Sequence, residues 1–139
     1  YVVKGMNLYF SGIVSAATRF WNNSDKSQKA KEELCFSFQE TIFAMITEVT
    51  ERALSHTRKQ ELILTGGVAA SECLRNMLDI MCKDRGVNFY ACDREYAGDC
   101  GANIAYTGLL AYKSGVRIDA KEADFNPNWR SDQVDVGWI

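Results

Sequence analysis

Small residues cluster where a short apolar run ends and an amphipathic pattern begins. Gly66 and Gly67 stand side by side at this junction, and Ser71 follows where the amphipathic pattern starts. Glycines let a ligand approach the backbone closely, and the first N–H groups of a helix favour an anion or another polar ligand. The junction therefore predicts a ligand site, with a tight turn packed on a neighbouring segment as the structural alternative. It is not a P-loop, because no Gly-Lys-Ser/Thr follows the glycines.

A second junction of the same kind carries an acidic residue. Asp99 stands between Gly98 and Cys100 at the start of another apolar helical pattern. Since the strands of a βαβ unit run the same way, both junctions should lie at one edge of the sheet, where ligands of open α/β sheets bind. The structural alternative for Asp99 is a helix cap worth about 1 kcal/mol. Residue chemistry alone slightly favours the structural alternative at both junctions.

Hydrophobic periodicity places these junctions in an alternating order of strands and helices. We predict a short helix capped by Ser11, a loop over 22–27, a long helix over about 28–57, strands at 61–65 and 87–92, a helix between them that ends at Gly86, a loop over 93–101, and a buried helix over 102–115. Because strand, helix, strand and helix alternate, the two strands should be parallel, with a right-handed crossover.

The composition is that of one ordinary globular domain. The chain has 139 residues, of which 47% are hydrophobic and 24% charged, and its net charge is -2. Basic residues do not dominate, which argues against strong nucleic-acid binding by this chain alone. No apolar run approaches the roughly 20 residues that span a bilayer, so we expect no membrane partner. Five cysteines without a close-spaced pair predict reduced, intracellular thiols and neither a zinc framework nor a redox dithiol.

Several motifs in order resemble one protein family. They are "KGMNLYFSGI", "LILTGGVAASECLR", "MCKDRG", "DREYAGDCGANIAYTGLLAYKSG" and "NWRSDQVDVGW". Together they resemble the C-terminal part of the tRNA threonylcarbamoyladenosine transferases, the catalytic subunits of the KEOPS complex, formerly labelled O-sialoglycoprotein endopeptidases. The resemblance implies an α/β fold, the C-terminal fragment of an actin-like, sugar-kinase and Hsp70 type of ATPase with ribonuclease-H-like halves. Residues 1–139 would form a single, helix-rich partial domain with about two parallel strands, and 116–139 a surface tail.

The resemblance also implies roles for the two junctions. Gly66, Gly67 and Ser71 would line the adenosine part of a nucleotide pocket, and Asp99 would be a metal ligand. The family has asparagine at the positions of Ser71 and Cys100. Its other metal ligands are two histidines nearer the N-terminus, so the fragment holds no catalytic residue and should be inactive alone.

The implied cofactors are one divalent metal ion, iron or zinc, and an adenylate-type donor or ATP in the cleft. The lone histidine, His56, matches no ligand of the family and is interpreted as a surface residue near a helix end.

The implied function is transfer of a threonylcarbamoyl group from its adenylate to the adenosine next to the anticodon of tRNA. The implied partners are the other KEOPS subunits, including a small protein kinase, and tRNA bound through the assembled complex. The implied location is the cytoplasm, with the nucleus as an additional one. Two alternatives remain: a phosphotransferase of the same fold, and a diverged assembly subunit without catalysis. The second rests on Ser71, Cys100 and Asn7, where the sequence departs from the family pattern.

Overall fold

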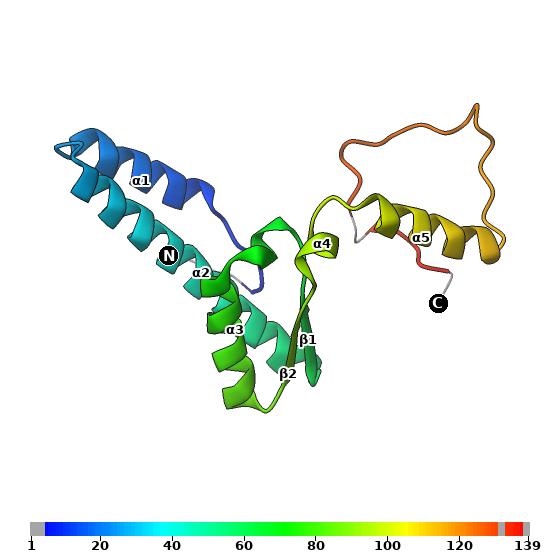
Figure 1. The fold of residues 1–139 in the computed structure, drawn as a ribbon, viewed down its shortest axis with the longest axis horizontal. Coiled ribbons are helices and arrows are strands. Elements are labelled where there is room, and N and C mark those ends of the chain that lie inside the picture. Colours follow the sequence, from blue (N-terminus) through cyan, green and yellow to red (C-terminus); the bar gives the residue numbers. More distant parts are fainter. Residues whose placement is uncertain (1–4, 131–132, 138–139) are drawn as a thin grey trace.

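The computed structural model describes residues 5–130 and 133–137, which form several helices and one small parallel sheet (Figure 1). In chain order the elements are α1 (Ser11–Asn23), α2 (Gln28–Thr57), β1 (Glu61–Leu64), the 3-10 helix η1 (Gly67–Ala70), α3 (Glu72–Arg85), β2 (Asn88–Ala91), α4 (Arg94–Ala97) and α5 (Gly101–Lys113). The long helix, both strands and the helix between them are confirmed. Gly86 ends α3 in the left-handed conformation, at φ 67°, as a C-terminal glycine commonly does.

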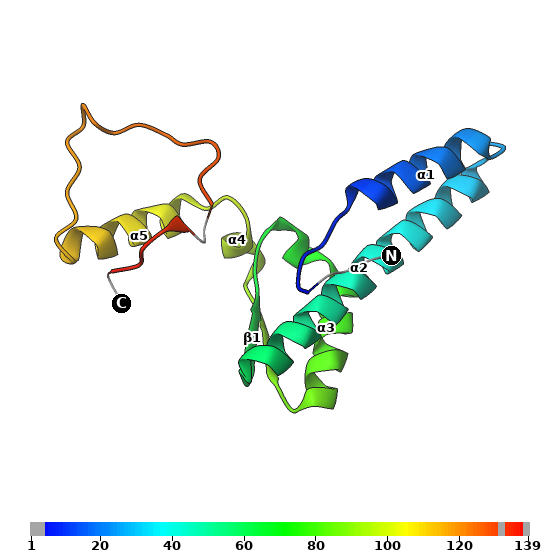
Figure 2. The ribbon, with the colours of Figure 1, turned by 180° about the vertical axis from the view of Figure 1, so that it is seen from behind.

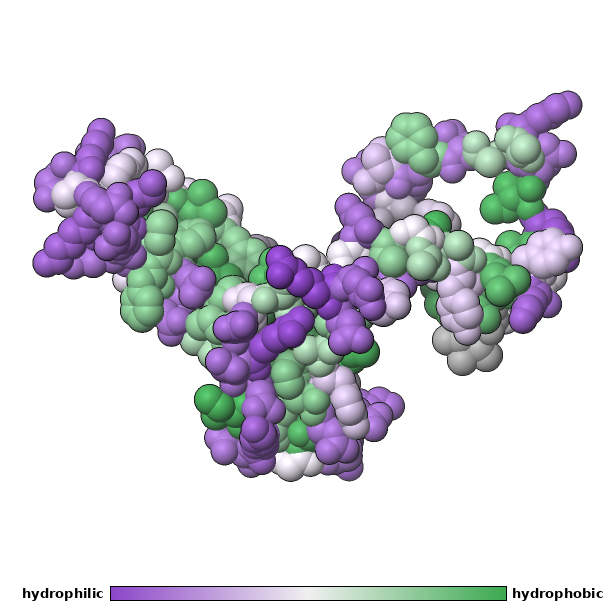
Figure 3. Space-filling view, in the orientation of Figure 1, coloured by the Kyte–Doolittle hydropathy of each residue, from purple (hydrophilic) through white to green (hydrophobic). Residues whose placement is uncertain are grey.

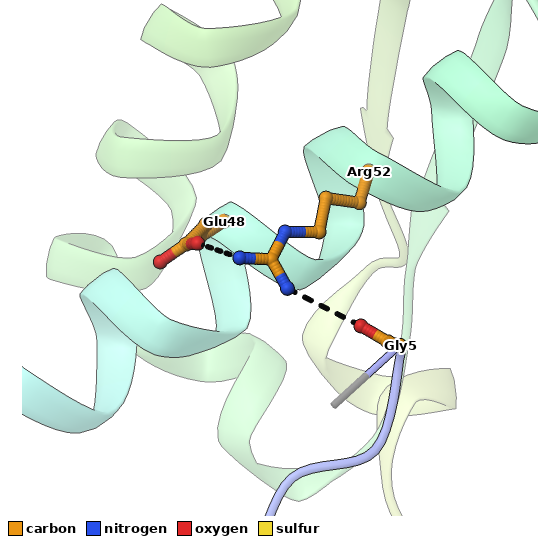
Figure 4. Close-up of polar contacts among 3 residues, drawn as sticks. All are labelled: Gly5, Glu48 and Arg52. Carbon is orange, nitrogen blue, oxygen red and sulfur yellow. Dashed lines mark hydrogen bonds and ion pairs between the residues drawn. The ribbon is translucent and has the colours of Figure 1, made fainter. Parts of the chain in front are cut away.

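Helices α1 and α2 form a hairpin that projects from one side of the sheet (Figures 1 and 2). Ser27 caps α2, because its hydroxyl oxygen accepts a hydrogen bond from the Ala30 N–H at 3.1 Å. The predicted cap by Ser11 is wrong: α1 begins at Ser11 itself, and the preceding residue, Phe10, has no side chain that could cap. Near the C-terminal end of α2, Arg52 forms an ion pair with Glu48. It also donates a hydrogen bond to the carbonyl oxygen of Gly5 at 3.3 Å (Figure 4).

The core lies between the two-stranded sheet and the helices α2 and α3. Strands β1 and β2 run parallel, as predicted, with Leu62 opposite Phe89 and Leu64 opposite Ala91. These inward residues alternate with exposed ones such as Ile63 and Tyr90, the period-two pattern of a half-covered sheet. The buried cluster consists of Phe43, Leu54, Leu74, Leu78, Met81 and Cys82.

Two expectations about the second half of the chain are wrong. The segment predicted as a loop over 93–101 contains the short helix α4, and α5, predicted to be buried, has no buried residue. Ile104, for example, is 76% exposed. Figures 1 and 3 show the reason: α5 projects away from the sheet with its apolar side chains uncovered. An apolar helix needs a covering layer, and the described part of this chain does not supply one.

Residues 116–130 form an exposed, irregular segment beside α5 (Figure 1). The predicted surface tail extends to 139, and positions 131, 132, 138 and 139 lie outside the described residues. Within the described ranges, none of the helices combines the length and the hydropathy that crossing a membrane requires.

Candidate functional site

The two strand-to-helix junctions meet at one edge of the sheet, as the parallel topology predicted. The Gly66–Gly67 turn and η1 follow β1, while α4 follows β2. Helix η1 contacts α4, and each of these two elements buries one alanine: Ala69 is 1% and Ala97 is 5% exposed. The small side chains allow the two loops to pack closely together.

Arg75, which sequence reasoning missed, connects these two loops. Its Nε donates a hydrogen bond to the carbonyl oxygen of Ala69, and one terminal nitrogen donates to the carbonyl oxygen of Cys92 at 3.3 Å. The backbone N–H of Arg75 also donates to the Ser71 carbonyl oxygen at 3.1 Å, within the first turn of α3. Position 75 follows the capping serine by one turn, so an arginine there can reach back over the helix N-terminus. That spacing is the signal that could have identified it.

The two glycines of the first junction have different reasons to be glycine. Gly66 has φ +100°, a conformation that other residues rarely adopt, so the turn itself requires it. Gly67 has no such requirement, and a Cβ placed on either residue would meet no described atom within 4 Å beyond its neighbours along the chain. The turn does pack on α4 through Ala69, as the structural alternative expects, although no neighbouring atom lies where a Cβ of Gly67 would be. The space beside Gly67 is open to a group from outside the described chain.

Ser71 caps helix α3, so the helix starts where the amphipathic pattern placed its beginning. Its hydroxyl oxygen accepts a hydrogen bond from the Leu74 N–H at 3.5 Å, and Glu72 places a carboxylate in the first turn. The helix end is thus already supplied with an acceptor and a negative charge, which disfavours an anion there. The hydroxyl proton of Ser71 remains available as a donor to an acceptor from outside the described chain.

Asp99 is exposed and lies just outside α5. The N-cap position belongs to Cys100, and the helix start carries no side-chain cap, so the capping interpretation of Asp99 is wrong. Within 5–130 and 133–137, no group of three or more His, Cys, Asp or Glu side chains is arranged to hold a metal ion. One carboxylate does not make a metal site, so these residues by themselves do not fit the implied ion.

His56 lies far along the chain from Asp99, in the last turn of α2 and ahead of β1. It is exposed and lines a polar hollow of about 520 Å³ with Glu51, Arg52 and Arg85, among others. Glu51 and Arg85 form an ion pair in this hollow. This environment agrees with the interpretation of His56 as a surface residue.

Two of the free thiols, those of Cys73 and Cys82, have a raised pKa. Burial raises the pKa of the Cys82 thiol, which is fully covered in the core. The Cys73 thiol donates a hydrogen bond to the Glu40 carboxylate at 3.3 Å, which raises its pKa as well. A raised thiol pKa lowers the fraction of nucleophilic thiolate at neutral pH, so neither residue is prepared for nucleophilic chemistry.

A groove of about 800 Å³ between α1 and α2 includes none of the predicted site residues. Its walls are largely apolar, with Phe20, Leu34 and Phe38 among them, and they carry no charged side chain. Its polar lining consists of hydroxyl groups, including those of Ser37 and Thr41, and of the first turn of α1 at Ser11.

Known proteins match this chain along its whole length. A protein of Methanococcoides burtonii named tRNA N6-adenosine threonylcarbamoyltransferase is 51% identical over 139 residues, and one of the same name from Methanocella arvoryzae is 49% identical. The alignments cover all of this chain but only 40% and 42% of those relatives. A Methanococcus vannielii protein named "Probable bifunctional tRNA threonylcarbamoyladenosine biosynthesis protein" is 46% identical, with 25% of its length covered.

The family model described as tRNA N6-adenosine threonylcarbamoyltransferase matches residues 1–106. This match contains both junctions, the Gly66–Ser71 turn and the loop that holds Asp99. The chain therefore belongs to the tRNA N6-adenosine threonylcarbamoyltransferase family.

Proposed function

We propose that this chain is part of an enzyme that transfers a threonylcarbamoyl group from its adenylate to the adenosine next to the anticodon of tRNA. The observation that carries the proposal is the family match over residues 1–106. The chain spans about two fifths of the length of the two relatives named tRNA N6-adenosine threonylcarbamoyltransferase. In this proposal the complete activity also requires the part of the enzyme that corresponds to the rest of those relatives. In the proposed whole, this chain belongs to the second half of an actin-like ATPase fold.

In this proposal the first junction binds the adenosine part of the donor. Gly67 leaves open space beside the backbone, and Ser71 offers a hydroxyl donor at the start of α3. Asp99 contributes one ligand to a divalent metal ion, iron or zinc, whose remaining ligands come from outside the described residues. Its exposed carboxylate has no partner among these residues, which leaves it available for that role.

The proposed partners are tRNA, bound through an assembled KEOPS complex, and the other subunits of that complex, including a small protein kinase. The net charge of -2 supports the proposal that this segment contributes little to binding the phosphate backbone of the tRNA. The proposed location is the cytoplasm, with the nucleus as an additional one.

The proposal is tested by assaying the whole enzyme with its partner subunits for threonylcarbamoyl transfer to tRNA. We expect the modified nucleoside to form when threonylcarbamoyl adenylate is supplied. Phosphoryl transfer from ATP to a small acceptor, without the modified nucleoside, would favour the phosphotransferase alternative. A complex that assembles but stays inactive in both assays would favour the assembly subunit.

Gly67→Ala in the whole enzyme should weaken donor binding without weakening the fold. Position 67 needs no positive φ and has no atom nearby, so the free energy of unfolding should change by no more than about 0.5 kcal/mol. A methyl group in a fitted pocket should lower donor affinity roughly tenfold, measurable by calorimetric titration with a non-hydrolysable adenylate. Gly108→Ala in α5 is the matched control, since its Cβ would also meet nothing within 4 Å. Equal affinities for the two variants would contradict a pocket at Gly67.

A further inference from the structure

The side chain of Arg75 lies where the two junction loops come together. The loops start at residues 65 and 92, after different strands, and η1 packs on α4 through small side chains. From α3, the Arg75 side chain donates hydrogen bonds both to η1 and to the segment after β2. One guanidinium thus joins the carbonyl oxygens of Ala69 and Cys92.

Only an arginine suits this arrangement. Its planar fork presents several N–H groups in fixed directions, so it can bond two carbonyl oxygens at once, whereas a lysine ammonium is a compact point charge on a flexible stem. The contacts are partly buried, and a hydrogen bond from a charged donor is roughly twice as strong as one between neutral groups. Loss of the guanidinium would leave two carbonyl groups without this donor.

We propose that Arg75 is a positioning residue that fixes the Gly66–Ser71 turn relative to the loop that carries Asp99. The first loop holds the proposed adenosine contacts and the second holds the proposed metal ligand, so this inference rests on the proposed function. A displacement of about 1 Å between reacting groups can cost about 100-fold in rate. Arg75 acts through the backbone of these loops and touches neither the donor nor the acceptor.

The test compares Arg75→Lys and Arg75→Met with Arg52→Met in the whole enzyme, assembled with its partners. Arg52 is a matched control because it also bonds a backbone carbonyl oxygen, that of Gly5, but lies on α2 away from the junctions (Figure 4). Two quantities are measured: amide hydrogen exchange of residues 66–71 and 92–98, and the KM and kcat for threonylcarbamoyl adenylate.

We expect both segments to exchange faster in the Arg75 variants, and KM to rise about tenfold with a smaller change in kcat. A purely structural role would reduce the amount of active enzyme, which lowers kcat and leaves KM unchanged, so an unchanged KM overturns the proposal. Unchanged exchange in the two segments overturns it as well. If Arg75→Met does not fold, Arg75→Lys decides, because it keeps the charge and most of the volume.

Failure of the proposed function can be told apart from failure of this inference. If the unmodified enzyme transfers no threonylcarbamoyl group, hydrogen exchange and the Kd of the adenylate replace the kinetic constants. Faster exchange with weaker adenylate binding would then support the positioning role, and unchanged values of both would overturn it.

Discussion

Asp99→Ala is expected to lower threonylcarbamoyl transfer to tRNA by about 100-fold or more when the whole enzyme is assayed with its partners. Asp99 is exposed and neither caps α5 nor contacts a partner in the described chain, so its removal should not disturb the fold. Loss of a ligand from an ion that stabilises transition-state charge costs several kcal/mol, which corresponds to this factor. The measurement is the yield of modified nucleoside per unit time, together with the metal content of the purified variant.

The matched control for this experiment is Asp124→Ala, which removes an exposed carboxylate from the irregular segment after α5. It should retain transfer and metal content, since surface substitutions away from special features change little. Full activity of Asp99→Ala, with unaltered metal content, would remove Asp99 from the site. An inactive unmodified enzyme would instead favour the non-catalytic alternative that Ser71 and Cys100 suggest.

Local patterns in the sequence predicted the parts of the fold that depend on local chemistry. The spacing of the apolar residues predicted where α3 lies, and Gly86 predicted where it ends. Both predictions were possible because capping and amphipathicity act within a few residues. The parallel order of β1 and β2 followed from the alternation of strands and helices. The start of α3 at Ser71 followed from the same local pattern.

Features that depend on contacts between distant segments could not be predicted in this way. The apolar composition of α5 predicted burial, yet burial requires a second layer that the described chain does not provide. Arg75 was missed because its partners, Ala69 and Cys92, become neighbours only when both loops are in place. Asp99 resembled a helix cap in sequence, but the helix began one residue too late for it to act as one.

The sequence therefore predicted where the candidate site lies, but not how its residues contact one another. Parallel topology alone brings both junctions to one edge of the sheet. The open space beside Gly67 became apparent only from the surroundings of its backbone, because a glycine can equally serve a turn, as Gly66 does. Distinguishing these two uses of glycine requires the three-dimensional structure.

Leu78→Ala should destabilise the protein by about 3 kcal/mol. Leu78 is 1% exposed and belongs to the buried cluster between α2, α3 and the sheet. Truncating a buried leucine removes favourable transfer free energy and leaves a cavity, which together cost 2–5 kcal/mol in typical cores. The change in the free energy of unfolding is measured by urea denaturation of the whole enzyme, following a signal from this domain.

Ile80→Ala is the matched control, because Ile80 lies two residues away on the same helix and is 61% exposed. Truncating a residue that is already largely in water should cost less than about 1 kcal/mol. A large difference between the two variants means that α3 packs on α2 and β2 through the Leu78 face, as the buried cluster requires. Equal destabilisation would mean that Ile80 is also covered in the whole enzyme, and α3 would then carry a second buried face that the remaining part of the enzyme supplies. If Leu78→Ala alone failed to fold, the predicted destabilisation would still be met, because Leu78 belongs to the small buried core.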